Sequence, residues 1–337
     1  MSELADELRD LIGDLASRSA DSGAPDDAAR LWEEVRGLGL SLIGIAEEHG
    51  GSGGTFDDLL VTVQALAENG LGLPIVASWV ADWVLSHAGR VDDGRWKTVA
   101  PADGGVSTTA GRVSGEVPGV PWARHADRLV LCPADGAPVV VNLRHEAVTV
   151  RTRENLAGEP RDTVVLDGAP VAPVQGGPAA AEIRDRLALL SSAVVAGAAH
   201  GAYRLTKTYV SERHQFDAPL LKLPAVATNL ALMRVHLVQA DAAMEQAGEN
   251  TSPTSAAVAR VTTAAAATEI ARLAHQLHGA MGISREYPLH HYTRRLWAWR
   301  DAVASERDWC ELLGRSAVGG GENEVWTRLT SVPPSAG

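Results

Sequence analysis

The stretch Gln276-Leu-His-Gly-Ala-Met-Gly-Ile-Ser-Arg-Glu-Tyr-Pro288 follows a long Ala-rich segment of helical periodicity and interrupts it. Gly279 and Gly282 allow a tight turn with closely spaced backbone N–H groups, and Gln276 adds an amide side chain. These groups suit the phosphates and hydroxyls of a ligand, although the same residues also make a plain turn between two helices. The stretch therefore predicts a helix that ends in a glycine turn, with a candidate binding site at the turn.

A second stretch, Arg213-His-Gln-Phe-Asp-Ala-Pro219, stands at the end of another helical segment. A cation with a nearby aromatic ring can hold a pyrophosphate and cover the edge of an adenine or flavin ring, so Arg213 and Phe216 are candidate binding residues. The alternative is an exposed arginine beside a core phenylalanine. Asp217 adds a negative charge next to the two candidates.

The sequence pattern divides the chain into regions with different predicted secondary structure. Apolar residues at helical spacing predict an N-terminal helical domain over residues 1–93. Short β-branched runs separated by Gly, Pro and Asp predict a central antiparallel β-domain over residues 94–176. Long Ala- and Leu-rich segments predict a C-terminal helical bundle over residues 177–318, and the Gly-, Ser- and Pro-rich residues 319–337 predict a flexible tail. The fold class is α+β, mainly α.

A glycine-rich loop at residues 50–54 lies within the first helical region. Thr55, followed by Asp57 and Asp58, predicts the start of a helix that runs through Ala67, because a capping hydroxyl and early acidic residues stabilise a helix N-terminus. The glycines do not keep the spacing of a dinucleotide fingerprint and no strand leads into them. We therefore expect a loop between helices at this place.

The composition excludes several classes of function. The 337 residues are 45% apolar, and 42 Asp plus Glu against 30 Lys plus Arg give a net charge of −12. Because no basic run is interleaved with aromatics, we expect no nucleic acid partner. No run of about 18 apolar residues occurs, so we expect a cytoplasmic protein without a membrane span. Cys132 and Cys310 have no partner at metal-ligand spacing, so we expect both to be buried and no metal to be bound.

The two stretches around Arg213 and Gln276 together resemble the Arg-x-x-Phe-Gly-x-Pro and Gln-x-x-Gly-Gly-x-Gly segments of the acyl-CoA dehydrogenase family. Residues 38–53 and 120–127 are similar to further segments of that family, so the resemblance covers nearly the whole chain. It implies the fold of that family, with an N-terminal helical domain, a central antiparallel β-domain and a C-terminal four-helix bundle.

The resemblance also implies FAD as cofactor, held across a subunit interface. The positions that match the family's cofactor contacts are Arg213, Phe216, Gln276, Gly279, Gly282 and Trp122. Asp217 stands where the family has a glycine, and Ala280 replaces the second glycine of a pair. Arg124 stands where the family has a threonine that meets the flavin, and residues 99–109 hold no clean counterpart of its Thr-Glu-Pro-x-x-Gly-Ser loop.

The catalytic base of the family has no counterpart in this sequence. Family members remove a proton α to the thioester carbonyl with a glutamate, and hydride passes from the β-carbon to the flavin. Counted from Glu286-Tyr-Pro288, the position of this glutamate falls on Val303, which cannot accept a proton. The position used by other members falls on Leu187 or an immediate neighbour, which leaves the catalytic residue unknown.

The carboxylates nearest to Val303 are Asp301 and Glu306. On a continuous helix they would project about 160° and about 60° away from Val303, so we expect them to pair with Arg300 or Arg307 instead.

The segment around Val303 is rich in tryptophan and arginine, and includes Trp297, Trp299 and Trp309. Trp and Arg are favoured in the cores of interfaces, so we expect this segment to pack against another subunit rather than to stack on a ligand.

From these residues we expect α,β-dehydrogenation of an acyl-CoA or acyl-carrier thioester, with FAD as hydride acceptor. The short chain and the missing base resemble the smaller partner of heteromeric enzymes of actinobacterial type, in which the second acyl-CoA dehydrogenase subunit supplies the base. A homo-oligomer is the other assembly. Two further functions stay open on the same fold: a flavin-dependent oxygenase, which needs no α-proton base, and a non-catalytic scaffold subunit.

Overall fold

The structure is a computed structural model that describes residues 3–20, 27–89, 94–102, 105–215 and 217–330. Its helices are α1 (Glu3–Ala20), α2 (Asp27–Gly37), α3 (Phe56–Glu68), α4 (Ile75–Ser86), α5 (Ala180–Glu212), α6 (Pro224–Glu249), α7 (Pro253–His278), α8 (Leu289–Arg300), α9 (Glu306–Gly320) and α10 (Glu322–Thr330). Short 3-10 turns are η1 (Leu40–Leu42), η2 (Glu47–His49), η3 (Leu220–Lys222) and η4 (Gly279–Ile283).

The strands are β1 (Lys97–Ala102), β2 (Val106–Thr109), β3 (Arg112–Pro121), β4 (Arg128–Pro133), β5 (Val139–Asn142), β6 (Val148–Arg151), β7 (Arg161–Pro173), β8 (His214–Gln215) and β9 (Ala218–Pro219). Contacts group the chain into two compact units. Unit 1 comprises Met1–Ser17, Leu60–Leu71 and Ala188–Gly337, and unit 2 comprises Arg18–Leu59 and Gly72–Leu187.

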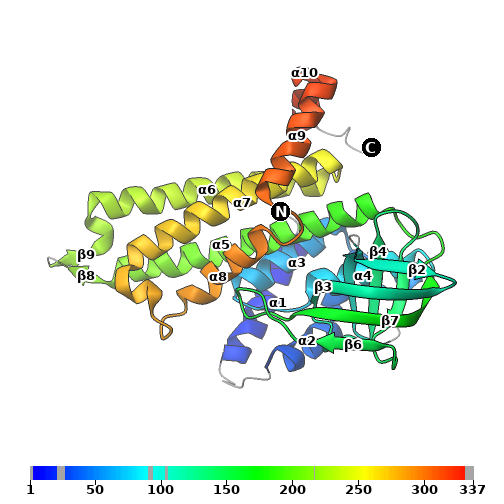
Figure 1. Ribbon diagram of the computed structural model, residues 1–337. Helices are drawn as coiled ribbons and strands as arrows, with labels where there is room; N and C mark the ends of the chain where they lie inside the picture. Colours follow the sequence, from blue (N-terminus) through cyan, green and yellow to red (C-terminus); the bar gives the residue numbers. More distant parts are fainter. Residues whose placement is uncertain (1–2, 21–26, 90–93, 103–104, 216, 331–337) are drawn as a thin grey trace. The chain divides into compact units, whose positions relative to one another are not determined.

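Unit 2 is built around a seven-stranded sheet (Figure 1) with the order β1-β4-β5-β7-β3-β2, in which β6 also pairs with β7. Alternating side chains of these strands, such as Val113, Val117 and Leu129, form one buried core. The neighbours are antiparallel as predicted, except that β1 and β4 run parallel. A parallel pair needs a crossover connection, and here β2 and β3 supply it because they lie between the two strands in sequence.

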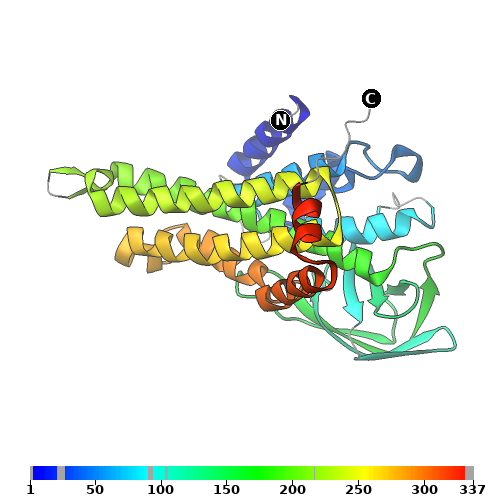
Figure 2. The same ribbon diagram turned by 90° about the horizontal axis from the view of Figure 1, so that it is seen from above.

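Unit 1 is dominated by three long helices, α5, α6 and α7, and α6 and α7 run side by side (Figure 2). The buried face of α7 consists mainly of small side chains, among them Ala256, Ala259 and Ala267. Small residues allow neighbouring helices to approach closely and to bury the backbone. The helical bundle predicted for the C-terminal region is confirmed, and so is the fold class.

Two glycines bring α5 close to its neighbours in unit 1. A Cβ atom added at Gly197 would lie 2.1 Å from the carbonyl oxygen of Gln64, and one added at Gly201 would lie 2.2 Å from Cε1 of Tyr292 and 2.6 Å from the carbonyl oxygen of Glu68. No real Cβ tolerates such distances, so both positions require glycine if α5 is to contact α3 and α8.

The start of α3 was predicted from its capping residues, and this prediction is confirmed. The backbone N–H of Thr55 donates to Asp58 Oδ2 at 2.8 Å, and the N–H of Asp58 lies 3.2 Å from Thr55 Oγ1. These reciprocal bonds satisfy two donors that a helix start leaves open. In the preceding loop, Gly50, Gly53 and Gly54 all have positive φ, which accounts for the glycine-rich sequence.

The two cysteines differ in environment. Cys132 on β4 is buried, as expected, and burial raises the pKa of its thiol to about 12. The prediction for Cys310 was wrong, because this residue is exposed. It lies next to Trp309, which occupies the buried face of the amphipathic helix α9 and turns its neighbour to solvent.

The C-terminal part departs from the sequence expectation. Where a flexible tail was predicted from residue 319, α9 continues to Gly320 and α10 follows. Residues 331–337 lie outside the described part of the chain, and the predicted domain boundaries stay a prediction. Within the described residues, every helix is too short or too polar to cross a lipid bilayer.

The close approach at Gly197 yields the first prediction. Gly197→Ala should lower the free energy of unfolding by about 1–3 kcal/mol, because the added methyl group overlaps the carbonyl of Gln64. The control is Gly314→Ala in α9, where nothing lies within 4 Å of the new Cβ and where alanine should stabilise the helix by roughly 0.5–1 kcal/mol. Urea unfolding measures both, and equal effects of the two substitutions would contradict the packing described for α5.

Candidate functional site

An aromatic cluster joins the two stretches that the sequence singled out. The ring of Tyr209, one helical turn before Arg213 on α5, stacks on the ring of His278 at the end of α7, with ring centroids 4.4 Å apart. Tyr287 closes the cluster, 5.0 Å from His278 and 5.7 Å from Tyr209. The structure thus brings the end of α5 and the turn after α7 together within unit 1.

His278 lies at the centre of this cluster and is 3% exposed. Its Nδ1 lies 2.8 Å from the carbonyl oxygen of Ala274, so Nδ1 carries the ring proton and donates it to that carbonyl. Its Nε2 is then an acceptor, and among the described residues no donor reaches it. Burial lowers the pKa of His278, against the opposing effect of the bond to Ala274, and nearby His275 lowers it further. His278 is therefore a neutral, buried acceptor without a partner in the described chain.

The glycines of the turn have distinct roles. Gly279 ends α7 with φ 57° and ψ −134°, a conformation that side-chain-bearing residues avoid, and the space around its missing Cβ is open. Gly282 is buried, and a Cβ there would lie 2.9 Å from Cβ of His278. Gly279 therefore shapes the exposed side of the turn, whereas Gly282 is required for packing against the aromatic cluster.

Gln276 is exposed on the last turn of α7, and its Oε1 accepts a bond from Arg272 Nη1 at 3.3 Å. Arg272 is itself paired with Glu269 at 2.7 Å. Gln276, Gly279 and the exposed Ala280 thus lie on the outer surface of the turn, where a ligand could reach them.

The hairpin after α5 presents Arg213 to solvent. The N–H of Leu220 donates to the carbonyl of Arg213 at 2.8 Å, which closes the short hairpin formed by β8 and β9. Asp217 has φ 61°, in the left-handed region that favours glycine and that Asp tolerates better than most residues. This backbone conformation explains a glycine preference at the position. Phe216, the other candidate in this stretch, lies outside the described residues.

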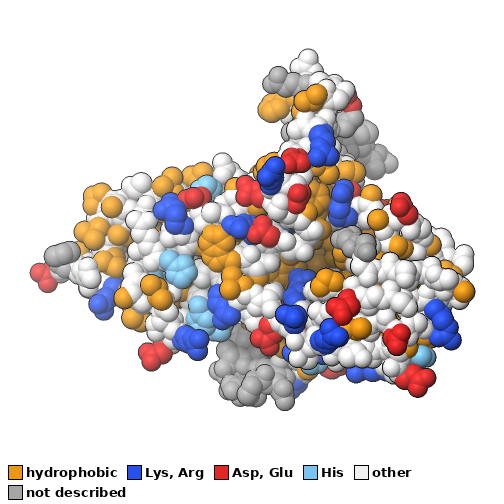
Figure 3. All heavy atoms as spheres, in the orientation of Figure 1, with side chains coloured by type: hydrophobic (Ala, Val, Ile, Leu, Met, Phe, Trp, Pro, Cys, Tyr) orange, Lys and Arg blue, Asp and Glu red, His pale blue; other side chains and the backbone are white. Residues whose placement is uncertain are grey.

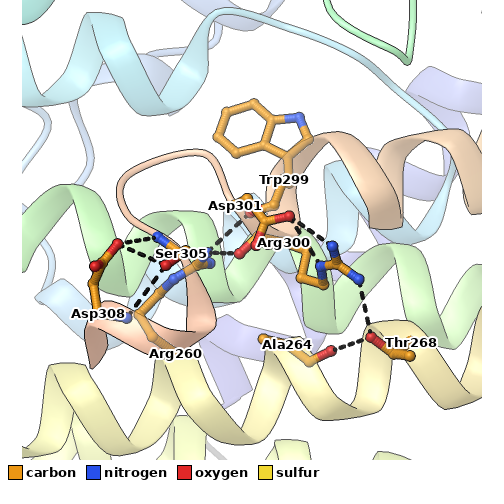
Figure 4. Close-up of polar contacts among 8 residues, drawn as sticks. All are labelled: Arg260, Ala264, Thr268, Trp299, Arg300, Asp301, Ser305 and Asp308. Atoms are coloured by element: carbon orange, nitrogen blue, oxygen red, sulfur yellow. Dashed lines mark hydrogen bonds and ion pairs between the residues drawn. The ribbon is translucent and has the colours of Figure 1, made fainter. Parts of the chain in front are cut away.

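The turn at residues 301–305, which contains Val303, is fixed by a buried arginine (Figure 4). Arg260 of α7 is 1% exposed, and its Nη2 donates to the carbonyl oxygens of Trp299 at 3.1 Å and of Arg300. These carbonyls are among the acceptors that the end of α8 leaves without an intrahelical partner. Burial lowers the pKa of Arg260 to about 10, and Asp301 acts in the opposite direction.

The same turn is held from both of its ends. Arg300 pairs with Asp301 at 2.8 Å and donates to Thr268 Oγ1 at 3.3 Å. At the start of α9, Ser305 Oγ and Asp308 Oδ2 lie 2.6 Å apart, and the bonds from Ser305 lower the pKa of Asp308 (Figure 4). The carboxylates of Asp301 and Asp308 are therefore engaged by their immediate neighbours.

The geometry corrects one assumption about Val303. It lies in the turn between α8 and α9 rather than on a continuous helix, so the projection angles expected for Asp301 and Glu306 do not apply. The predicted pairing of Asp301 with Arg300 is confirmed. The predicted pairing of Glu306 with Arg307 was wrong, because Arg307 binds Glu311 at 3.1 Å. Glu306 is the first residue of α9, where the partial positive charge of the helix N-terminus stabilises a carboxylate.

The sequence predicted that the tryptophans of this segment pack against another subunit, and for Trp299 and Trp309 this prediction was wrong. Trp299 and Trp309 are 8% and 2% exposed, because they pack inside the chain. Only Trp297 is partly exposed, with the guanidinium of Arg300 4.7 Å from its ring centroid.

Two further sequence candidates lie in unit 2. Leu187 is a half-buried apolar residue on α5. Its neighbour Arg186 stacks on Phe56, with 4.3 Å between the guanidinium carbon and the ring centroid, and lies 5.3 Å from the Trp83 ring. Burial lowers the pKa of Arg186, against the opposing charge of Glu182. The residue next to Leu187 is therefore a cation. The nearest carboxylate before it on α5 is Asp185, which is buried and pairs with Arg184 at 3.3 Å, and burial raises its pKa.

Trp122 follows β3 and is buried, with φ 54°. A left-handed conformation is unusual for a bulky residue and is often kept at functional positions. Arg124, two residues later, donates to Asp162 Oδ1 at 2.7 Å and to the carbonyl of Arg153 at 2.6 Å. Asp162 is fully buried, so the guanidinium of Arg124 compensates the buried charge of its carboxylate. The guanidinium therefore bonds to protein groups.

Sequence reasoning missed His278 and Arg260 as elements of the site. His278 lies inside the quoted stretch, but its ring partners are distant in sequence. Arg260 carried no motif at all. Among the described residues, no group of three or more His, Cys, Asp or Glu side chains is arranged to hold a metal ion.

Comparison with known proteins gives a consistent picture. The family description "Acyl-CoA dehydrogenase, C-terminal domain" matches residues 178–300. The chain is 27% identical over 314 residues to the acyl-CoA dehydrogenase IpdE2 of Mycobacterium tuberculosis. This alignment covers 92% of this chain and 90% of IpdE2. It is 30% identical over 305 residues to the acyl-CoA dehydrogenase FadE34 of the same organism. This alignment covers 83% of this chain but only 41% of FadE34.

A solved structure shares the fold. The ChsE4–ChsE5 complex from Mycobacterium tuberculosis superimposes with a TM-score of 0.85 at 21% identity, over 94% of this chain and 98% of the compared chain.

The neutral His278 gives a prediction for pH dependence. Its pKa in the folded chain is below the ordinary value near 6.5, so the unfolded chain binds more protons between the two values and stability falls as the pH drops through this range. His278→Phe keeps the ring stack but cannot be protonated. We expect the melting temperature of the variant to fall less than that of the wild type between about pH 8 and about pH 5. Tyr209→Phe, which leaves the histidine in place, should keep the wild-type dependence, and an unchanged profile for His278→Phe would refute the assignment.

Proposed function

Because this chain belongs to the acyl-CoA dehydrogenase family, we propose that it is a flavin-binding subunit of an acyl-CoA dehydrogenase whose proton-abstracting carboxylate comes from a second subunit. The observation that carries the proposal is the side chain of Val303 in the turn between α8 and α9. The substrate is an acyl thioester, on CoA or on a carrier protein.

The donor set at the ends of α5 and α7 fits the phosphate-bearing part of FAD. Arg213 offers an exposed cation, Gln276 an exposed amide group, and Gly279 a turn with open space where a side chain would stand. These features support cofactor binding by Arg213, Gln276 and Gly279, whereas Phe216 and Gly282 stay candidates from the sequence alone.

The fit is weaker for the flavin ring. Trp122 supplies a buried aromatic ring in a strained conformation, which supports its assignment as a flavin neighbour. Arg124, at the position of the family's threonine, is committed to Asp162 and offers no hydroxyl. Bound FAD would supply the hydride acceptor for oxidation at the β-carbon of the thioester.

The chain's own residues bind and orient rather than remove the proton. Removal of the α-proton requires a carboxylate aimed at the α-carbon with a pKa raised by an apolar pocket. Val303 and Leu187 have no ionisable group, Asp301 is paired with Arg300, and Asp308 caps α9. Glu306 is the remaining carboxylate near the turn. A carboxylate from a partner subunit therefore completes the chemistry in this proposal.

The known neighbours support such a partner. One of the solved structures with the same fold is a complex of two differently named chains, ChsE4 and ChsE5. By analogy, we infer a heteromer of this chain with a second acyl-CoA dehydrogenase subunit as the active assembly.

The test is oxidation of acyl-CoA substrates with an artificial electron acceptor by this chain alone and after co-expression with a candidate partner subunit. We expect turnover only with the partner, together with flavin absorbance in the blue region. Glu306→Gln should leave the activity of the complex unchanged. Turnover by the isolated chain that Glu306→Gln abolishes would overturn the proposal, because this chain would then contain its own base.

A second candidate function is a non-catalytic subunit without flavin. It is favoured by the commitment of Arg124 and by the negative charge of Asp217 beside Arg213. A complex that is active while all of its flavin remains with the partner after dissociation would support this alternative.

Asp217 yields a prediction about cofactor affinity. Asp217→Gly relieves a left-handed backbone conformation and removes a negative charge next to the expected diphosphate. We expect the dissociation constant of FAD to fall about tenfold, which corresponds to roughly 1.4 kcal/mol. Asp217→Asn separates the two effects, because it removes the charge and keeps a residue that tolerates positive φ. An affinity that stays unchanged in both variants would place the diphosphate elsewhere.

A further inference from the structure

Arg260 carries a positive charge in the interior of unit 1. Its side chain, on α7, is 1% exposed, and burial lowers its pKa only to about 10, so the guanidinium stays protonated at neutral pH. Its Nη2 group donates to the carbonyl oxygens of Trp299 and Arg300. The Nε and Nη1 groups are buried as well, and no acceptor among the described residues reaches them. Arg260 therefore combines a buried charge with open donors.

Among the residues that the structure describes, no carboxylate forms an ion pair with this guanidinium. The charge of Asp301 acts on Arg260 and raises its pKa, but the carboxylate of Asp301 is bound by Arg300 at 2.8 Å. Asp308 accepts instead from the backbone N–H and the hydroxyl of Ser305. Figure 4 shows the guanidinium of Arg260 between the end of α8 and Ser305, with both carboxylates engaged by their own neighbours.

The exposed arginines of unit 1 are paired differently. Arg272 binds Glu269 at 2.7 Å and Arg315 binds Glu311 at 2.9 Å. On the face drawn in Figure 3, basic and acidic side chains are likewise interspersed. At the surface even an unpaired charge is hydrated, whereas a buried charge loses most of its solvation and needs a partner. Arg260 is therefore the arginine with the greatest need for an anion, and the described chain supplies none.

The chemistry of the site defines the partner. The partner is small, because Arg260 is almost completely buried and the turn at residues 302–304 beside it is half-buried. A buried water can accept from a guanidinium and often joins unsatisfied polar groups, but a neutral molecule does not offset the charge. A monovalent inorganic anion such as chloride accepts N–H donors and also balances the single positive charge.

We propose that Arg260 binds a small inorganic anion of the size of chloride in the interior of unit 1, beside the turn at residues 301–305, with donors from Nε and Nη1. The ion balances the charge of Arg260 while Nη2 keeps its bonds to the end of α8, so its binding stabilises the turn that contains Val303. The site goes beyond the proposed function, because it depends on neither the flavin nor the base-supplying subunit.

The first test compares thermal unfolding in sodium chloride and in sodium gluconate, whose anion is too large for a closed site. Between about 10 and about 200 mM salt, the melting temperature of the wild type should rise by roughly 2–4 °C more in chloride, because a ligand that binds only the folded chain stabilises it. Arg260→Met removes the charge and the donors and should abolish this difference. Arg315→Met, on the exposed face of α9, is the matched control and should keep it.

A second variant leaves Arg260 in place and so keeps the test informative if Arg260→Met does not fold. Asp301→Asn removes the negative charge that acts on Arg260 and that would repel a bound anion. The chloride concentration at half-maximal stabilisation should therefore fall roughly threefold to tenfold. An unchanged concentration would overturn the proposal, because the ion would then not lie beside Arg260.

Crystals of the chain soaked in sodium bromide locate the ion directly by its anomalous scattering. The expected result is a peak within hydrogen-bond distance of Nε or Nη1 of Arg260. Water without an anomalous peak at this place, equal melting temperatures in the two salts, or the same chloride effect in the wild type and in Arg260→Met would each overturn the proposal. Flavin absorbance and partner-dependent turnover report on the proposed function separately, so that either proposal can fail alone.

Discussion

The guanidinium of Arg260 is the interaction on which the account of the missing base depends. It lies in the interior of unit 1, caps the carbonyls of Trp299 and Arg300, and so ends α8 at Arg300. Removing the two carbonyl acceptors from Arg260 would leave a buried charge without these partners, which is costly. The turn at residues 301–305 is therefore not a loose connection that could bring any nearby carboxylate to the expected base position. Val303 occupies a defined place between two capped helix ends.

The two motifs read from the sequence are physically coupled in unit 1. Tyr209, one turn before Arg213, stacks on His278, which lies between Gln276 and Gly279. The close packing of Gly282 on His278 adds a second constraint on the turn. A change at the aromatic cluster should therefore alter the hairpin and the turn together. This coupling supports the proposal that the two short motifs, some sixty residues apart, bind one cofactor together.

Local patterns in the sequence predicted most of the elements, because the forces that form them are local. The Thr55 cap and the glycine turn at Gly279 involve neighbouring residues only, and both predictions held. Failures arose where distant residues decide the outcome. The end of α8 is set by Arg260, forty positions upstream, and the parallel pairing of β1 with β4 depends on a crossover. The strain at Trp122 and the orphan acceptor of His278 likewise cannot be seen in sequence periodicity.

The central claim, that this chain lacks a base for the α-carbon, is tested most directly by proton exchange. The isolated chain is incubated with acyl-CoA in deuterated water, and deuterium at the α-carbon is followed by mass spectrometry. This step needs a base but no electron acceptor, so it does not depend on how the flavin is reoxidised. The account predicts no exchange above the uncatalysed rate for this chain and rapid exchange once the partner subunit is added. Rapid exchange by the isolated chain would contradict it.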